Sequence, residues 1–335
     1  MPSFTRHARE LWPRHPWLPV APLALWVGLM ALLGRLRLDH VIILAIAAAL
    51  AYGTRRSRGI YVAVGGFIAV ALLYDAMRFV QNVGLTPERV LLCGLHDFEA
   101  RWFGLTTAAG RMAPHDWFLV HHHLVADLFF SVPYGTFIFV TFGYLVYLAV
   151  VEPSAAGRFG WTFFLLNVAG FITYHLVPAA PPWYFHAHGC VVDLAAHASE
   201  GTALARVDAF TGIPYFEAFY GRSSDVFGAI PSLHVAYPLL IVRETFRRQG
   251  TVARSLALGY WVWMCLAAVY LDHHWISDIL LGWVYAAAAI ALMTRLWPLA
   301  RPQLVPRAVP SPAPVVASPR PHLEGPPGST GEARD

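Results

Sequence analysis

Eight runs of apolar residues, with few or no charges inside them, constrain this chain more than any other feature. They lie at about 18–34, 41–54, 59–74, 128–151, 159–177, 229–242, 255–271 and 279–296. A helix needs roughly 20 residues to cross a bilayer core, and several runs reach that length only with flanking Trp, Tyr and His, which favour the membrane surface. The pattern predicts an all-α polytopic membrane bundle of about eight transmembrane helices, or seven if 18–54 forms one span and a shallow segment.

The composition agrees with this class. Hydrophobic residues make up 57% of the chain, charged residues make up 13%, and the mean hydropathy is +0.51, which is too apolar for a soluble globule. In a soluble protein the net charge of +4 would suggest acidic partners. Here the arginines cluster in short loops, so we attribute the charge to topology and expect no nucleic-acid partner.

Charge in the loops predicts the orientation. Residues 55–58 include three arginines, residues 243–254 carry four arginines against one glutamate (net +3), and residues 178–229 carry two arginines against five acidic residues (net −3). Cytoplasmic loops are enriched in basic residues. We therefore expect a plasma (inner) membrane protein with both termini in the cytoplasm, and with residues 82–125, 178–229 and 271–275 on the opposite side.

The chain is expected to have three parts: N-terminal membrane helices (1–82), a catalytic membrane core (83–297) and a disordered Pro-rich cytoplasmic tail (298–335). Of the three cysteines, Cys265 falls in an apolar run and is expected to be a small core residue. Cys93 and Cys190 fall on the same predicted face, where one option is a disulfide. Gly65-Gly66 is interpreted as close helix packing.

The segment Val269-Tyr-Leu-Asp-His-His-Trp-Ile-Ser-Asp278 carries the strongest functional signal. It joins the last two apolar runs, so its imidazoles and carboxylates are expected at a membrane surface. On a helix, His274 and Asp278 share one face, because side chains four residues apart are neighbours. A hydrogen bond from one ring nitrogen to Asp278 would fix the tautomer of His274 and leave its other nitrogen free to attack an electrophile.

Forty residues upstream stands Gly228-Ala-Ile-Pro-Ser-Leu-His234. Together the two segments resemble the second and third motifs (P-S-G-H and S-R-x5-H-x3-D) of the type 2 phosphatidic acid phosphatase superfamily, which acts on phosphate esters through a phosphohistidine. Leu233 replaces the glycine of the second motif, and Ala267-Ala268 replace Ser-Arg of the third. The family's first motif, K-x6-R-P, is absent because the chain has no lysine.

These departures point to one branch. The segments Phe227–His234, Pro178-Ala-Ala-Pro-Pro-Trp-Tyr184 and Tyr270–His274 resemble the fungal inositol phosphorylceramide synthases and their bacterial relatives. Weaker similarity continues through Leu95–Gly104 and Pro133-Tyr-Gly135, so that the resemblance covers about 95–296.

The predicted roles follow from the needs of phosphate-ester chemistry. His274 is expected to be the nucleophile and Asp278 its support. His234 is expected to protonate the departing alkoxide and then to deprotonate the acceptor hydroxyl. Asp272 and His273 flank the nucleophile, and His273 is a candidate for binding the headgroup; the alternative is a capping and interfacial pair. No cofactor is expected.

The groups that neutralise phosphate are harder to identify, because the superfamily's Lys and Arg residues are missing. Candidates are backbone N–H groups from Gly228 to Ser232, the Ser232 hydroxyl, Arg222, and Arg78 near Asp75. The alternative for Arg78 is a snorkelling interfacial charge.

The aromatic loop with Pro181, Pro182, Trp183 and Tyr184 is predicted to end a helix and to cover the pocket. His121-His122-His123 suggests a metal site at first sight, but consecutive positions on a helix diverge, and we expect no metal.

The leading hypothesis is a lipid phosphotransferase that moves a phosphoinositol-like headgroup from a phospholipid donor to a lipid alcohol, with ceramide as the acceptor that the resemblance implies. The first alternative is a phosphatase acting on phosphatidic acid, phosphatidylglycerol phosphate or a polyprenyl phosphate or pyrophosphate. The second is a non-catalytic membrane scaffold or transporter.

Overall fold

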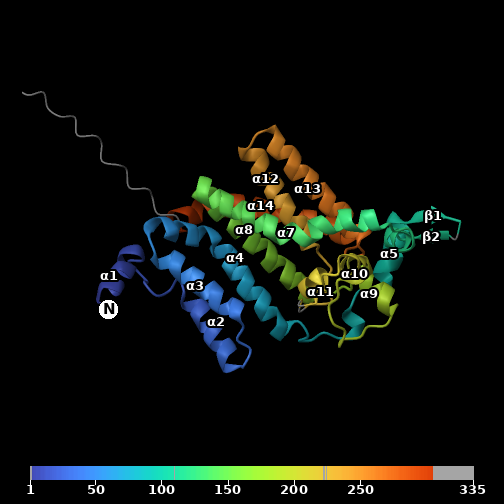
Figure 1. Ribbon diagram of the computed structural model, residues 1–335, viewed down its shortest axis with the longest axis horizontal. Coiled ribbons are helices and arrows are strands. Elements are labelled where there is room, and N and C mark those ends of the chain that lie inside the picture. The colour runs from blue at the N-terminus through green and yellow to red at the C-terminus, as the bar shows by residue number, and fades with distance from the viewer. Residues whose placement is uncertain (1, 109, 222, 224, 305–335) are drawn as a thin grey trace, which may run out of the picture. The chain divides into compact units, whose positions relative to one another are not determined.

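The computed structural model describes residues 2–304 except 109, 222 and 224, and each predicted apolar run corresponds to a helix in it (Figure 1). The eight helices are α2 (Ala21–Leu32), α3 (Leu38–Tyr52), α4 (Arg55–Val80), α7 (Leu124–Val151), α8 (Pro153–Leu176), α12 (Leu233–Arg248), α13 (Thr251–Tyr270) and α14 (Ile276–Leu304). The prediction of a helical polytopic membrane protein is confirmed. Helix α14 includes the first seven residues of the predicted tail; residues 305–335 lie outside the described part of the chain.

Within the described residues, five helices are long and apolar enough to cross a membrane: α4, α7, α8, α13 and α14. Helices α2 and α3 are apolar but have 12 and 15 residues, and α12 has 16. All three are shorter than the roughly 20 residues that a bilayer core requires. Residues 18–54 therefore form two short helices, neither of which is a full-length span by itself.

Helix α8 lies at the centre of the core and packs against α4, α7, α12 and α14. Its side chains Phe159, Phe163 and Leu166 are at most 1% exposed. Helix α4 approaches it closely at Gly66, where an added Cβ atom would lie 2.1 Å from the carbonyl oxygen of Gly160. The prediction of close helix packing at Gly65-Gly66 is confirmed at Gly66, because no residue with a side chain fits there.

The segment between α4 and α7 and the segment between α8 and α12 gather at the end of the bundle where α8 ends and α12 and α14 begin, which we call the site end (Figure 1). They contain a 3₁₀ turn at Pro87–Arg89 and five short helices: α5 (Cys93–Phe103), α6 (Pro114–Val120), α9 (Pro182–His188), α10 (Gly201–Thr211) and α11 (Tyr215–Tyr220). A small antiparallel hairpin, β1 (Leu105–Thr107) and β2 (Gly110–Met112), pairs Leu105 with Met112; the sequence analysis did not expect it. At the N-terminus of the chain, α1 (Pro2–Leu11) packs on α3.

Backbone hydrogen bonds join three distant segments at the site end. Ala179 forms parallel bridges with Leu91 on one side and Gly228 on the other. A disulfide between Cys93 and Cys190, with Cα atoms 5.5 Å apart, fastens α5 to the segment that follows α9. Cys265 is a free thiol packed against the main core, as predicted.

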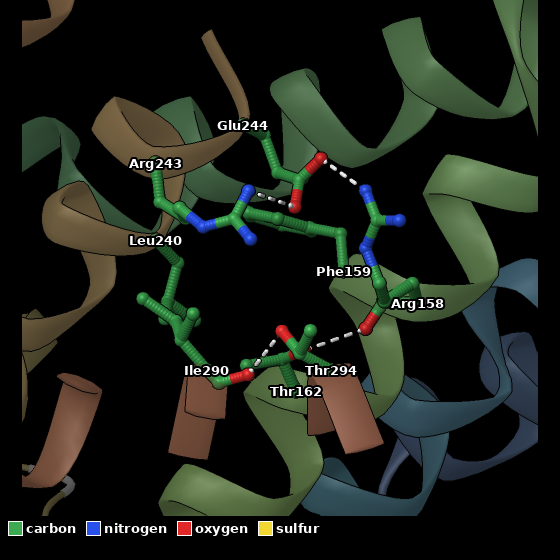
Figure 2. Close-up of a pocket in the computed structure, with 8 residues that line it drawn as sticks. All are labelled: Arg158, Phe159, Thr162, Leu240, Arg243, Glu244, Ile290 and Thr294. Carbon is green, nitrogen blue, oxygen red and sulfur yellow. Dashed lines mark hydrogen bonds and ion pairs between the residues drawn. The ribbon is translucent and has the colours of Figure 1, made fainter. Parts of the chain in front are cut away.

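A charged cluster closes the opposite end of α8 and α12. Figure 2 shows the guanidinium groups of Arg158 and Arg243 facing the carboxylate of Glu244 across a small pocket between α8, α12 and α14. Arg158 Nη2 and Arg248 Nε donate to the same oxygen, Glu244 Oε2, over 2.6 and 2.9 Å. Glu244 lies ten residues after His234 on α12, which corresponds to about 15 Å along the helix. The charged cluster is thus separate from the site end.

Candidate active site

The nucleophile candidate lies in the loop between α13 and α14. His274 precedes the first residue of α14 by two positions, and Asp278 lies in the first turn of that helix. Although His274 is outside the helix, the predicted pair is formed: His274 Nδ1 is 3.4 Å from Asp278 Oδ2. The same oxygen accepts a hydrogen bond from the backbone N–H of Trp275 (3.1 Å). Asp278 therefore caps its own helix while it orients the imidazole.

His234, in the first turn of α12, is in direct contact with the nucleophile candidate. Its Nδ1 atom lies 2.9 Å from Nε2 of His274. If His274 donates from Nδ1 to Asp278, its Nε2 atom carries a lone pair and accepts from His234. The Tyr220 hydroxyl lies 3.5 Å from the other ring nitrogen of His234. Burial, reinforced by the neighbouring His234, holds the pKa of His274 well below 6.5, which keeps the imidazole neutral and nucleophilic.

Local packing explains two residues of the second motif. The backbone N–H of Ser232 donates to the carbonyl of Asp278 (3.0 Å), so that the start of α12 is hydrogen-bonded to the start of α14. Gly282 permits this approach, since an added Cβ atom would lie 2.4 Å from the Ser232 carbonyl oxygen. Leu233, which replaces the family's glycine, packs on Gly170 of α8, where an added Cβ atom would lie 3.1 Å from a Leu233 methyl group. The larger residue is thus accommodated by a glycine on another helix.

The loop 271–275 is held from several sides. His115 donates from Nε2 to the carbonyl of His274 (2.7 Å), and burial lowers the pKa of His115 to about 4. The indole N–H of Trp275 donates to the carbonyl of Ala180 (2.8 Å), and the backbone N–H of Trp183 donates to that of Asp272 (2.9 Å). Segments far apart in the sequence thus fix the backbone of the nucleophile candidate.

The Pro-rich motif has a structural role that the sequence analysis did not anticipate. Helix α8 ends before it, and α9 begins at Pro182. Pro181, Pro182, Trp183 and Tyr184 are buried; the side chains of Trp183 and Tyr184 form a cluster with Val90, Leu92 and Phe227. These side chains pack the bridged segments together beside the loop 271–275.

Glu99 is a buried carboxylate that the sequence analysis did not single out. It is 0% exposed, and its two oxygens accept hydrogen bonds from the backbone N–H groups of Ile276 (3.0 Å) and Ser277 (2.9 Å). These N–H groups lack partners within α14 because they are in its first turn. Glu99 could have been noticed in the sequence only as an acidic residue inside the segment Leu95–Gly104. The family resemblance of that segment is weak.

A chain of four titratable groups leads to Asp272. Asp116 accepts hydrogen bonds from Nε2 of His96 (3.1 Å) and Nε2 of His186 (2.9 Å), and His186 donates from Nδ1 to Asp272 Oδ2 (2.7 Å). Burial disfavours the charged form of His186, but its two carboxylate partners outweigh burial and raise its pKa to about 9. Burial raises the pKa of Asp116, yet its histidine partners more than offset this and hold it well below its usual value.

The predicted substrate-binding residues differ in their surroundings. The Ser232 hydroxyl is buried, and Gly228 lies beside Asp225 and Tyr174, with no space for a side chain. Arg78 forms an ion pair with Asp75, whose carboxylate also contacts Arg37 and His40. Arg222 lies outside the described residues.

His273 is buried against aromatic rings next to His234. His121 stacks on Trp117, and His123 accepts a hydrogen bond at the start of α7. Among the described residues, no group of three or more His, Cys, Asp or Glu side chains is arranged to hold a metal ion.

Two imidazoles and a carboxylate at one end of a membrane helix bundle are groups that can supply a nucleophile and a proton donor for attack on a phosphate ester. The comparisons agree: the model of the PAP2 superfamily matches residues 101–292, and the chain belongs to this superfamily. The predicted family is therefore confirmed, and the protein is an enzyme of the lipid phosphotransferase type.

Three relatives are informative. The chain is 32% identical to the phosphoinositol dihydroceramide synthase of Bacteroides thetaiotaomicron over 78% of this chain and 85% of that protein. It is 28% identical to the inositol phosphorylceramide synthase catalytic subunit of Schizosaccharomyces pombe over 52% of this chain and 42% of the relative. For the inositol phosphorylceramide synthase of Candida albicans the values are 30%, 47% and 34%. The chain thus spans less than half the length of these two fungal proteins. No solved structure matches the chain.

Proposed function

We propose that the protein transfers a phosphoinositol-like headgroup from a phospholipid to a lipid alcohol such as ceramide, through a phosphohistidine on His274. The observation that carries this proposal is the contact of His234 Nδ1 with His274 Nε2, with Asp278 on the far side of the nucleophile. The names of the relatives support the headgroup and the class of acceptor.

The reaction would proceed in two steps. His274 Nε2 attacks phosphorus and the bond between phosphorus and the glycerol oxygen breaks. His234 enters this step as the imidazolium, having taken up a proton when the donor binds, and delivers one proton to the departing diacylglycerol. In the second step His234 removes the proton from the acceptor hydroxyl, which attacks the phosphohistidine and releases neutral His274. Asp278 stabilises the positive charge of the phosphoimidazole without bonding to phosphorus.

The Ser232 hydroxyl, the backbone at Gly228 and the cations Arg78 and Arg222 are our candidates for contacting the phosphate, and His273 for contacting the headgroup. Pro181, Pro182, Trp183 and Tyr184 would support the wall of this site. We place the catalytic part of the chain at 83–297. In line with the loop charges, we place the site on the extracytoplasmic face of the plasma (inner) membrane.

The absence of lysine favours a phosphodiester donor over a phosphomonoester. A phosphodiester carries one negative charge, whereas phosphatidic acid approaches two and requires more cationic groups. The test is a competition between equal amounts of labelled phosphatidylinositol and labelled phosphatidic acid, with ceramide present. We expect transfer of the headgroup to ceramide. Release of inorganic phosphate from phosphatidic acid, without headgroup transfer, would instead establish the phosphatase alternative.

A further inference from the structure

Two buried acceptor atoms lie directly before the nucleophile candidate. Oδ1 of Asp272 and Nε2 of His273 are buried and have no hydrogen-bond partner among the described residues. Both residues are about 95% buried. Buried polar atoms are nearly always hydrogen-bonded in folded proteins, so two such atoms on adjacent residues of the loop 271–275 require an explanation.

The protonation of His273 follows from its contacts. Its Nδ1 atom donates to the carbonyl of Leu271 over 2.8 Å. Burial lowers the pKa of His273 to about 4, so the ring is neutral near pH 7. A neutral imidazole that donates from Nδ1 has a lone pair at Nε2. The free nitrogen of His273 is therefore a hydrogen-bond acceptor.

The side chain of Asp272 is held through Oδ2, while its Oδ1 atom has no hydrogen-bond partner among the described residues. Its Oδ2 atom accepts from His186, which also contacts Asp116, and its backbone adopts φ +67°, a conformation that Asp and Asn tolerate better than most residues. Burial raises the pKa of Asp272 to about 6, against the opposing effect of the protonated His186, so the carboxylate form still predominates near pH 7. A carboxylate accepts hydrogen bonds and donates none.

These residues adjoin the proposed reaction centre. The His273 ring lies 4.9 Å from the ring of Tyr134 and 5.2 Å from that of Tyr220, measured between centroids. The same two tyrosines contact His234, at 4.9 and 6.1 Å. His273 thus shares an aromatic wall with His234, and His274 follows it in the chain.

We propose that Asp272 and His273 form a headgroup subsite that selects phospholipids whose headgroup carries free hydroxyl groups. Phosphate oxygens are acceptors and cannot satisfy two further acceptors, whereas the hydroxyls of a polyol donate hydrogen bonds to both. An ammonium headgroup fits less well, because the imidazolium of His186 lies 2.7 Å from the Asp272 carboxylate and repels a second cation. The inference rests on the proposed function and assigns the specificity of the same site to two atoms.

The test compares three phosphodiester donors: phosphatidylinositol, phosphatidylmethanol, which has no headgroup hydroxyl, and phosphatidylethanolamine. For each, kcat/KM is measured with purified protein and a fixed acceptor. Asp272→Asn keeps the size and tolerates the positive φ but removes the charge. His273→Asn retains a donor for the Leu271 carbonyl but removes the free nitrogen.

His122→Asn is the matched control for His273→Asn, because exposed His122 makes the same type of contact, from Nδ1 to the carbonyl of Leu119. Asp97→Asn, at an 82% exposed side chain, is the control for Asp272.

We expect each site variant to lower the ratio of kcat/KM for phosphatidylinositol to that for phosphatidylmethanol by about tenfold or more, because a lost hydroxyl partner leaves a buried group unpaired. The controls should leave the ratio unchanged. Equal losses with both donors, including complete loss, would assign the residues to the catalytic framework and overturn the inference. A loss confined to phosphatidylethanolamine would overturn it in favour of an ammonium site. If the wild-type protein turned over none of the three donors, the proposed function itself would fail. If the wild type were active but both site variants kept its ratio of kcat/KM values, only the headgroup subsite would be refuted.

Discussion

His234 Nδ1 and His274 Nε2 lie 2.9 Å apart, within hydrogen-bonding distance, although one residue is in the first turn of α12 and the other, 40 positions later, is in the loop before α14. This contact places a proton donor against the nitrogen that we propose as the nucleophile. A phosphorus atom and its leaving oxygen must enter between the two rings, so the rings must separate when a donor lipid binds. The contact therefore describes the resting site, in which each imidazole satisfies the other.

Replacement of His274 tests the covalent step. Because His274 carries the nitrogen that we propose attacks phosphorus, His274→Ala should lower turnover by about a thousandfold or more. Rapid acid-free quenching with a donor lipid labelled in its phosphate should trap an acid-labile phosphoenzyme in the wild type and none in the variant. Near-normal activity in His274→Ala would contradict the assignment.

Replacement of His234 tests proton delivery to the leaving group. An alkoxide requires protonation as it departs, whereas p-nitrophenolate does not. In a single turnover, His234→Gln should therefore slow formation of the phosphoenzyme by about a hundredfold or more with phosphatidylinositol, and by a much smaller factor with a p-nitrophenyl phosphodiester that otherwise binds. Equal losses with both substrates would show that His234 acts through binding or packing.

Glu99 is expected to position the start of α14. Glu99→Ala leaves the N–H groups of Ile276 and Ser277 buried without their partner, which should cost about 1–2 kcal/mol of stability. Glu99→Gln keeps one oxygen that can accept one of these two hydrogen bonds, so its stability should lie between those of the wild type and Glu99→Ala. In both variants kcat should fall while KM changes little, as measured beside thermal unfolding in detergent. A changed KM with unchanged kcat would argue against a positioning role.

The His186 chain predicts a loss of stability at alkaline pH. The folded-state pKa of about 9 lies above the usual 6.5, so the stabilisation is fully present below pH 6.5 and is lost as the pH rises through 9. The shift corresponds to at most about 3 kcal/mol. Thermal unfolding between pH 7 and 10 should show this decline in the wild type and in the exposed control His122→Gln, but not in His186→Gln. An equal decline in His186→Gln would exclude His186 as its source.

The orientation in the membrane is tested by cysteine labelling. With Cys265 replaced and the Cys93–Cys190 disulfide intact, single cysteines are placed at the exposed positions His197 and Thr251. A membrane-impermeant thiol reagent added to intact cells should label position 197 and not 251, because the segment 178–229 is acidic and 243–254 is basic. Labelling at 251 alone would reverse the proposed topology.

The tertiary structure revealed the support around the site. Glu99, His115, Asp116 and His186 were not predictable from the sequence, because each contacts a segment remote from its own. The bond from Glu99 to Ile276, for example, joins residues 177 positions apart. The hairpin β1–β2 was missed because two strands of three residues carry too little alternation to be distinguished from a loop. Which cysteines pair was also undecided, because spacing alone does not determine disulfide connectivity.

The sequence by itself predicted the eight helices that correspond to the apolar runs, and it singled out His234, His274 and Asp278 as the candidate catalytic residues. The helices follow from runs of apolar residues, and the pairing of His274 with Asp278 follows from their spacing of four. His234 was identified by the resemblance of its segment to a family motif. The contact between His234 and His274, the capping of α14 by Glu99 and the clamping of the loop 271–275 were decided by tertiary structure alone. They depend on how α8, α12 and α14 pack at Gly170 and Gly282, where the lack of a side chain lets neighbouring helices approach closely in an arrangement that the linear sequence leaves free.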